Sequence, residues 1–190
     1  MRFRSFIASL GTAAMLVSFA APASAALPSL IPRDVLFGPP VRTGPALSPD
    51  GKRLAYLAPS NGVLAVWERT IGASDDRVVA SDPKRPIRNA FWSPDGARIL
   101  FLQDAGGDEN FHLFAVDPAA PGTPADLTPY PKTRVGVESI DYAQPATILI
   151  TMNKRDPKVF DVYRLDPKTG NATLDTQNPG NVAGFAEDTH

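Results

Sequence analysis

Short apolar runs separated by turn-forming residues recur along the chain. Residues 46–57 read Ala-Leu-Ser-Pro-Asp-Gly-Lys-Arg-Leu-Ala-Tyr-Leu, and residues 91–102 repeat the pattern as Phe-Trp-Ser-Pro-Asp-Gly-Ala-Arg-Ile-Leu-Phe-Leu. The two copies lie 45 residues apart, since Ser48 corresponds to Ser93. Short apolar runs bounded by Pro and Gly are typical of strands, so the pattern predicts β-structure.

A third copy has lost the Ser-Pro-Asp-Gly turn but keeps the rest of the pattern. At an offset of 49 residues, three separate segments match their earlier counterparts: 146–150, 160–163 and 165–167 match 97–101, 111–114 and 116–118. A strand-rich repeat with a period near 45 indicates the blades of a β-propeller.

We therefore predict an all-β fold, an incomplete β-propeller of about three four-stranded blades plus the first strand of a fourth. The expected organisation is a signal peptide at 1–25, a lead-in at 26–43 with one helical turn near Arg33–Phe37, and a partial propeller at 44–190. Within the propeller we expect blades at about 44–82, 86–129 and 134–176, and a stub at 181–190. Propellers close with about 4–8 blades, which favours a fragment of a longer protein. The alternative is a short protein that self-associates through open blade edges.

The repeated Ser-Pro-Asp-Gly segments predict tight turns between strands. Pro presets φ, Asp can bond nearby backbone, and Gly accepts the positive φ that follows. The expected structural turns are Ser48, Pro49, Asp50 and Gly51 in the first copy, and Ser93, Pro94, Asp95 and Gly96 in the second. Arg53 and Arg98 recur after the turns, and we expect each to pair with a carboxylate of a neighbouring loop.

The N-terminus has the layout of a cleaved secretory signal. Arg2 and Arg4 precede the uncharged stretch from Phe6 to Ala21, and Ala-Ser-Ala at 23–25 supplies a cleavage pattern. An uncleaved anchor is the alternative. The sequence predicts a bacterial periplasmic or secreted protein that contacts no membrane after cleavage.

Composition narrows the range of partners. After cleavage at Ala25 the chain has 17 basic and 20 acidic residues, and its net charge of −3 gives no reason to expect nucleic acid. It has no cysteine, so neither a disulfide nor a lipid-attachment cysteine is available. We expect no cofactor and no metal.

The most charged loop, at 104–110, is the candidate site. Glu109, and with it Asp108, could pair with the amino terminus of a substrate, or the loop carboxylates could hold a cation. The simpler alternative is a hairpin loop whose Asp and Asn residues bond their own backbone. For Trp67, Trp92 and His112 we expect packing roles rather than ligand binding.

An ordered set of segments resembles the N-terminus of secreted prolyl oligopeptidase family serine peptidases, of the dipeptidyl- and acylaminoacyl-peptidase-like kind. The segments that carry the resemblance are 31–38 (Ile-Pro-Arg-Asp-Val-Leu-Phe-Gly), 47–56, 61–67, 107–114, 155–165 and 178–184.

The resemblance implies a propeller that gates and orients peptide substrates for a C-terminal α/β-hydrolase domain bearing a Ser-His-Asp triad. This chain carries no Gly-x-Ser-x-Gly segment and only two histidines, His112 and His190, so we expect no catalytic residue in it and no activity from it alone. The alternative function is a non-enzymatic periplasmic propeller of the TolB-like kind, which binds protein partners.

Overall fold

The computed structural model describes residues 29–38 and 41–188, and the expected signal peptide at 1–25 lies outside these residues. The described residues belong to two separate units, divided after Gly38. In the first unit, helix α1 (Arg33–Phe37) forms the single turn expected there, and the Gly38 N–H bonds the carbonyl of Asp34 at 2.8 Å. Nowhere in 29–38 or 41–188 is there a helix with the length and apolar character needed to cross a membrane.

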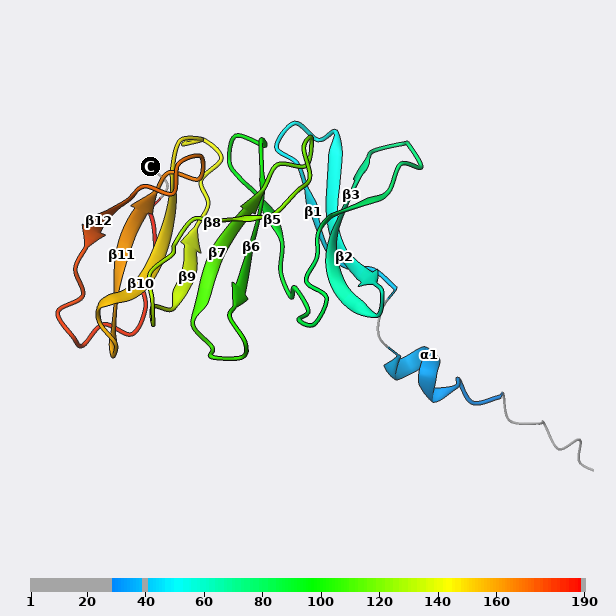
Figure 1. Ribbon diagram of the computed structural model, residues 1–190, viewed down its shortest axis with the longest axis horizontal. Helices are drawn as coiled ribbons and strands as arrows, with labels where there is room; N and C mark the ends of the chain where they lie inside the picture. Colours follow the sequence, from blue (N-terminus) through cyan, green and yellow to red (C-terminus); the bar gives the residue numbers. More distant parts are fainter. Residues whose placement is uncertain (1–28, 39–40, 189–190) are drawn as a thin grey trace, which may run out of the picture. The chain divides into compact units, whose positions relative to one another are not determined.

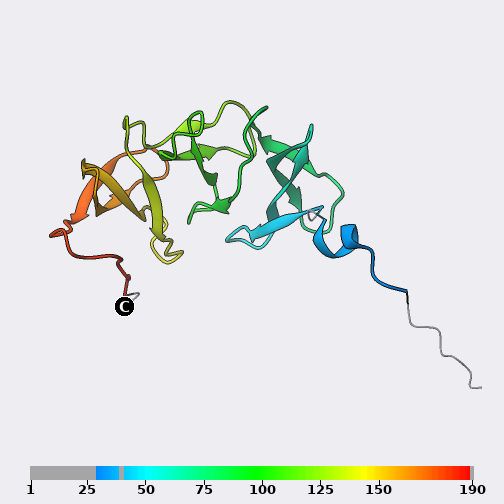
Figure 2. The ribbon, with the colours of Figure 1, turned by 90° about the horizontal axis from the view of Figure 1, so that it is seen from below.

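The second unit is built from three four-stranded antiparallel sheets, each running in chain order (Figure 1). The strands are β1 (Thr43–Leu47), β2 (Arg53–Ser60), β3 (Val63–Thr70), β4 (Arg77–Ala80), β5 (Phe91–Trp92), β6 (Ile99–Asp104), β7 (Phe111–Val116), β8 (Ala125–Asp126), β9 (Val135–Ser139), β10 (Ile148–Asp156), β11 (Val159–Leu165) and β12 (Ala172–Thr176). We call the sheets blades 1, 2 and 3; Figure 2 shows them from a second direction. The three predicted blades are confirmed.

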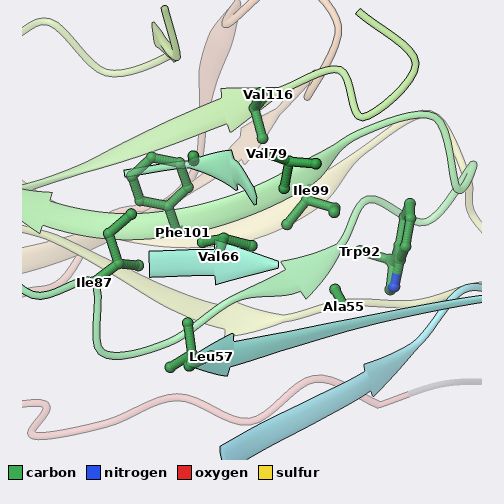
Figure 3. Close-up of a cluster of buried hydrophobic side chains, with 10 residues drawn as sticks. Ala55, Leu57, Val66, Val79, Ile87, Trp92, Ile99, Phe101 and Val116 are labelled. Atoms are coloured by element: carbon green, nitrogen blue, oxygen red, sulfur yellow. The ribbon is translucent and has the colours of Figure 1, made fainter. Parts of the chain in front are cut away.

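Two apolar cores lie between successive blades. Side chains alternate along a strand, so Ile99 and Phe101 of β6 belong to the core shared with blade 1, and Leu100 belongs to the core shared with blade 3. Figure 3 shows the first core, in which Trp92 and Val66 are fully buried. Blade 2 is therefore apolar on both faces, as the unbroken run Ile-Leu-Phe-Leu requires.

The two Ser-Pro-Asp-Gly segments form nearly identical turns. In the first, the Ser48 hydroxyl donates to Asp50 Oδ1 at 2.6 Å and accepts from the Arg53 N–H at 2.9 Å. Gly51 has φ +70°, and its N–H bonds the Ser48 carbonyl at 2.8 Å. Ser93, Asp95 and Gly96 repeat these bonds at 2.6 and 2.8 Å. Each turn closes on itself and so joins its first two strands in a fixed register.

The prediction that Arg53 and Arg98 pair with carboxylates of neighbouring loops is wrong. Arg53 Nη2 donates to the carbonyl of Gly96 at 2.7 Å, and Arg98 Nη1 donates to the carbonyls of Pro167 and Lys168 at 3.1 and 2.9 Å. Turns present unpaired carbonyls as well as carboxylates, and a guanidinium with its five donors can satisfy either. Each arginine thus links its own blade to a turn of the next blade.

The two tryptophans fill packing positions. Trp92 is buried beneath the Arg53 guanidinium, which lies 4.5 Å from the centre of the ring, and its Nε1 donates to the Ala46 carbonyl of blade 1 at 2.9 Å. Trp67 stacks on Tyr56, with a distance of 6.5 Å between ring centroids. Burial, followed by a hydrogen bond to Asp76, raises the pKa of Tyr56 to about 12.

His112 joins two strands of blade 2. Its Nδ1 lies 2.7 Å from Asp126 Oδ2, and Asp126 Oδ1 accepts from the Thr128 N–H at 2.9 Å. The ring therefore contributes to pairing between β7 and the segment that begins with β8. His190 lies outside the described residues.

The expected opening strand of a fourth blade at 181–190 is not formed within the described residues, which carry no strand after Thr176. A strand requires a partner to pair its backbone, and this segment is held differently. The Asn178 side-chain amide donates to the carbonyls of Phe160 and Val182 at 3.2 and 2.8 Å.

An ion pair between a half-exposed arginine and a buried carboxylate supports that arrangement. The Asp161 carboxylate is fully buried and bonds Arg155 Nε and Nη2, both at 2.8 Å, while the Asn178 N–H also donates to it at 2.8 Å. The Arg155 hydrogen bonds hold the pKa of Asp161 below its ordinary value, against the opposing effect of burial.

Removing the link between blades 2 and 3 should destabilise their packing. We expect Arg98→Ala to lower the free energy of unfolding by about 1–3 kcal/mol, because two carbonyls lose charged donors. Urea unfolding measures the loss. Arg88→Ala, at an exposed arginine with no partner among the described residues, is the matched control and should stay within about 0.5 kcal/mol. Equal losses in the two variants would contradict the assignment.

Removing the buried carboxylate should also destabilise the fold, and the loss should depend on pH. We expect Asp161→Asn to lose about 1–3 kcal/mol at pH 7, because a neutral amide cannot replace the charge-assisted bonds to Arg155 and to the Asn178 N–H. Since the folded-state pKa of Asp161 is lowered, its contribution is present above the ordinary pKa of about 4 and disappears as pH falls through the folded value.

The gap between wild type and Asp161→Asn in urea unfolding should therefore narrow on acidification from pH 7 to pH 3. Asp175→Asn is the control, because its pair with Arg164 is partly exposed and should contribute about 1 kcal/mol or less. A gap that stays constant with pH would show that Asp161 acts through packing rather than charge.

Candidate functional site

The charged loop at 104–110 joins β6 to β7 and is fixed by its first residue. Asp104 Oδ2 accepts from the Glu109 N–H at 3.1 Å, and the Asp104 carboxylate forms an ion pair with Arg85. Arg85 Nη1 also donates to the Asp104 carbonyl at 2.9 Å. Burial would raise the pKa of Asp104, but its bonds to Arg85 and Glu109 outweigh that effect and lower it. The loop is thus anchored to the segment that connects blades 1 and 2.

Glu109 has an unfavourable backbone conformation. Its φ is +60°, a left-handed value that costs a side-chain-bearing residue about 1–2 kcal/mol. Its N–H bond to Asp104 maintains that conformation. The Glu109 side chain is exposed, and its carboxylate has no hydrogen-bond or ion-pair partner in the part of the chain that the structure describes.

Asp108, the second candidate from the sequence, is occupied within the loop. Its two carboxylate oxygens accept from the Asn110 N–H and side-chain amide, both at 3.1 Å. The bond from the Asn110 side chain lowers the pKa of Asp108 most. Of the two candidates, Glu109 has the carboxylate that is available to a ligand.

A cavity of about 720 Å³ lies at this end of blades 2 and 3, and Glu109 lines it while Asp108 does not. Its walls combine charged, polar and aromatic side chains with backbone from both blades. They are formed by Arg85, Pro86, Arg88, Asn89, Leu102, Gln103, Asp104, Gly107, Glu109, Phe111, Arg134, Val135, Gly136, Thr151 and Phe160.

The charges around the cavity are of both signs. Arg85 and Asp104 neutralise each other. That leaves Glu109 lining the same cavity as two further arginines, Arg88 and Arg134. Neither of these arginines has a carboxylate partner among residues 29–38 and 41–188, and the Arg134 guanidinium lies 5.7 Å from the centre of the Phe111 ring. Such a cavity suits a ligand that carries both an amino group and an anionic group.

One wall depends on the absence of a side chain. A Cβ placed on Gly136 would lie 2.7 Å from Thr151 Oγ1, closer than real Cβ atoms approach a neighbour. Gly136 therefore lets β9 lie close against Thr151 of β10 where the two strands border the cavity.

The described residues provide no set of ligands for a cation in this loop. No group of three or more His, Asp or Glu side chains comes together there in a way that could hold a metal ion. The Asp104 carboxylate instead forms an ion pair with Arg85 and accepts from the Glu109 N–H, while Asp108 accepts from the Asn110 N–H.

Two curated proteins are similar in sequence. Dipeptidyl aminopeptidase BIII of Pseudoxanthomonas mexicana is 45% identical over 160 residues, which is 84% of this chain and 23% of that protein. Dipeptidyl peptidase family member 6 of Caenorhabditis elegans is 33% identical over 156 residues, 78% of this chain and 21% of that protein. The chain thus spans less than a quarter of the length of these relatives. No family model matches the sequence.

Solved structures share the fold. Prolyl oligopeptidase B of Galerina marginata has a TM-score of 0.54 at 15% identity over 73% of this chain and 21% of its own. TolB of Acinetobacter baumannii has a TM-score of 0.50 at 22% identity over 70% of this chain and 32% of its own. The peptidase relatives and the propeller fold agree. This chain is a propeller region of the prolyl oligopeptidase family.

In this prolyl oligopeptidase propeller region, the sequence pattern indicates the loop but not the two arginines, Arg88 and Arg134, that have no carboxylate partner among the described residues. Arg88 lies in the connection between blades 1 and 2, and Arg134 directly precedes β9. In a four-stranded meander, the hairpin between the second and third strands emerges at the same end as the connections between blades. Combining that rule with the blade repeat would have brought residues 88, 109 and 134 together.

The close approach at Gly136 gives a test of the cavity wall. We expect Gly136→Ala to cost about 1–3 kcal/mol of unfolding free energy, because the new methyl group meets the Thr151 hydroxyl. Thr151→Ala should remove most of that cost, so the double variant should show a favourable coupling above about 0.5 kcal/mol in urea unfolding. Additive losses would mean that Thr151 is not the obstacle.

Proposed function

We propose that this chain is an N-terminal part of the propeller of a secreted serine peptidase, and that this propeller admits peptide substrates and orients them for hydrolysis. Cleavage would proceed by Ser-His-Asp acyl transfer in an α/β-hydrolase domain that is C-terminal to this chain. The 45% identity to a dipeptidyl aminopeptidase, over 84% of this chain and only 23% of that protein, is the observation that carries the proposal.

The cavity suggests how orientation is achieved. A peptide's α-ammonium group would pair with the Glu109 carboxylate, which is exposed, unpartnered among the described residues and held by its N–H bond to Asp104. Charge-assisted hydrogen bonds of this kind are about twice as strong as neutral ones. Asp108 would contribute by shaping the hairpin rather than by contacting substrate.

We place the protein in the periplasm or outside the cell. The supporting observation is the charged start, apolar stretch and Ala-Ser-Ala pattern of residues 1–25. A mass measurement on the protein from the expressing cell tests this, because cleavage leaves Ala26 as the first residue.

A TolB-like binding function is the second candidate, supported by the shared propeller fold. That likeness is at 22% identity and concerns the fold alone. Turnover of peptides by the full-length protein decides between the two: a protein with this propeller and no peptidase activity would favour the binding function.

Neutralising Glu109 should weaken capture of the amino terminus. In the full-length protein we expect Glu109→Gln to raise KM for a free-amino peptide about tenfold to hundredfold, because an ion pair becomes a neutral contact. The same peptide with an acetylated amino group, assayed as a competitive inhibitor, should have the same inhibition constant against the wild type and Glu109→Gln.

The adjacent Asp108→Asn is the matched control, since it removes the same charge from a side chain that does not line the cavity. Its KM should change by less than about threefold, because an Asn side-chain oxygen can still accept the Asn110 N–H bond that shapes the hairpin, and an exposed charge that contacts no ligand contributes little. A KM unchanged by Glu109→Gln, or equal effects of the two variants, would refute the role of Glu109.

A further inference from the structure

Two arginines that line the cavity, Arg88 and Arg134, form no ion pair with any described residue. The lining carries three arginines and two carboxylates, and one arginine and one carboxylate are consumed by the pair of Arg85 with Asp104. If Glu109 binds an amino group, Arg88 and Arg134 remain as two positively charged residues that line the same cavity.

The backbone on either side of Arg88 is firmly held. Its predecessor Ile87 is buried in the core between blades 1 and 2, and the Ile87 N–H bonds the Leu64 carbonyl at 3.0 Å. Its successor Asn89 accepts from the Leu102 N–H at 3.0 Å through Oδ1. The Arg88 side chain is exposed between these two anchors, so the fold fixes the backbone from which it extends, and no described residue uses its donors.

Arg134 is placed in the same manner from the other side of the cavity. Thr133 and Val135, which flank it, are both buried, and the Arg134 N–H bonds Asn153 Oδ1 at 2.6 Å. Its guanidinium lies over the Phe111 ring. Contact with an aromatic ring fixes the plane of a guanidinium while its N–H edge stays available to a ligand.

Both guanidinium groups therefore have N–H donors available to a ligand, and the ring contact additionally orients that of Arg134. A guanidinium bonds a carboxylate through two parallel N–H donors. A ligand with an amide in place of the carboxylate has a similar shape but no negative charge, so it is bound more weakly. The cavity's polar and aromatic walls have room for more than one side chain of a peptide.

We propose that Arg88 and Arg134 form a carboxylate-binding subsite, which selects peptides bearing a carboxylate close to the amino terminus that Glu109 holds. This inference rests on the proposed function. The carboxylate can come from an acidic side chain or from the free carboxyl terminus of a short peptide, and both present the same planar anion to the arginines.

Paired peptides test the subsite in the full-length protein. One pair differs by Glu against Gln at the second or third residue, and the other by a free against an amidated carboxyl terminus. Dissociation constants from calorimetry and KM values should both favour the carboxylate at least about tenfold in one or both pairs. A preference within the first pair identifies the side chain as the source, and one within the second identifies the terminus.

Variants then test whether Arg88 and Arg134 cause the preference for peptides with a carboxylate. Arg88→Ala and Arg134→Ala should each reduce it several-fold, and the double variant should abolish it while binding the Gln or amidated peptides as wild type does. Lys84→Ala is the matched control, because it removes an exposed positive charge from the same connection without touching the cavity. It should leave the preference intact.

The outcomes separate the two proposals. Peptide turnover with no carboxylate preference in either pair overturns the subsite and leaves the proposed function standing. Carboxylate preference in calorimetry without turnover of any peptide supports the subsite and refutes the peptidase. A preference that survives the double variant, or that Lys84→Ala reduces equally, also overturns the subsite.

Discussion

A sheet that is apolar on both faces must be covered on both, and this constraint shapes the blades of this protein. Ile99 and Phe101 of β6 point to one side and Leu100 to the other, each nearly inaccessible to water. Burying side chains of this size contributes about 1.5–3 kcal/mol each. Blade 2 obtains that burial only with blade 1 on one face and blade 3 on the other, so the sheets stack and their polar residues gather at the ends.

Polar contacts refine the stacking that burial drives. Arg53 reaches the turn of blade 2 and Arg98 reaches the turn of blade 3, and both bond carbonyls that a turn leaves unpaired. The Arg53 guanidinium at the same time covers the Trp92 ring, whose Nε1 bonds back to blade 1. Apolar packing holds neighbouring blades together, and these directional bonds fix how one blade is positioned against the next.

The candidate site follows from the same architecture. The hairpins between second and third strands lie at the same end as the connections between blades, and residues there need not be apolar. Charged side chains of both signs that have no ion-pair partner among the described residues line one cavity at this end. Glu109 keeps a left-handed backbone that glycine would adopt at lower cost. Strained residues of this kind are concentrated at functional sites, which agrees with the proposed contact between Glu109 and substrate.

The sequence by itself determined what depends on neighbours along the chain. The Ser-Pro-Asp-Gly turns close through bonds between residues two to five apart, so their residue types specify them, and the repeated apolar runs specify three blades. Only the tertiary structure decided what depends on residues far apart in sequence. The partners of Arg98 are about 70 residues away, the segment 179–188 forms no strand with any described residue, and Arg88, Glu109 and Arg134 line one cavity only after the blades have stacked. Local bonding follows from local sequence, whereas the choice among many carbonyls and carboxylates within reach of a long side chain is made by the packing of the blades.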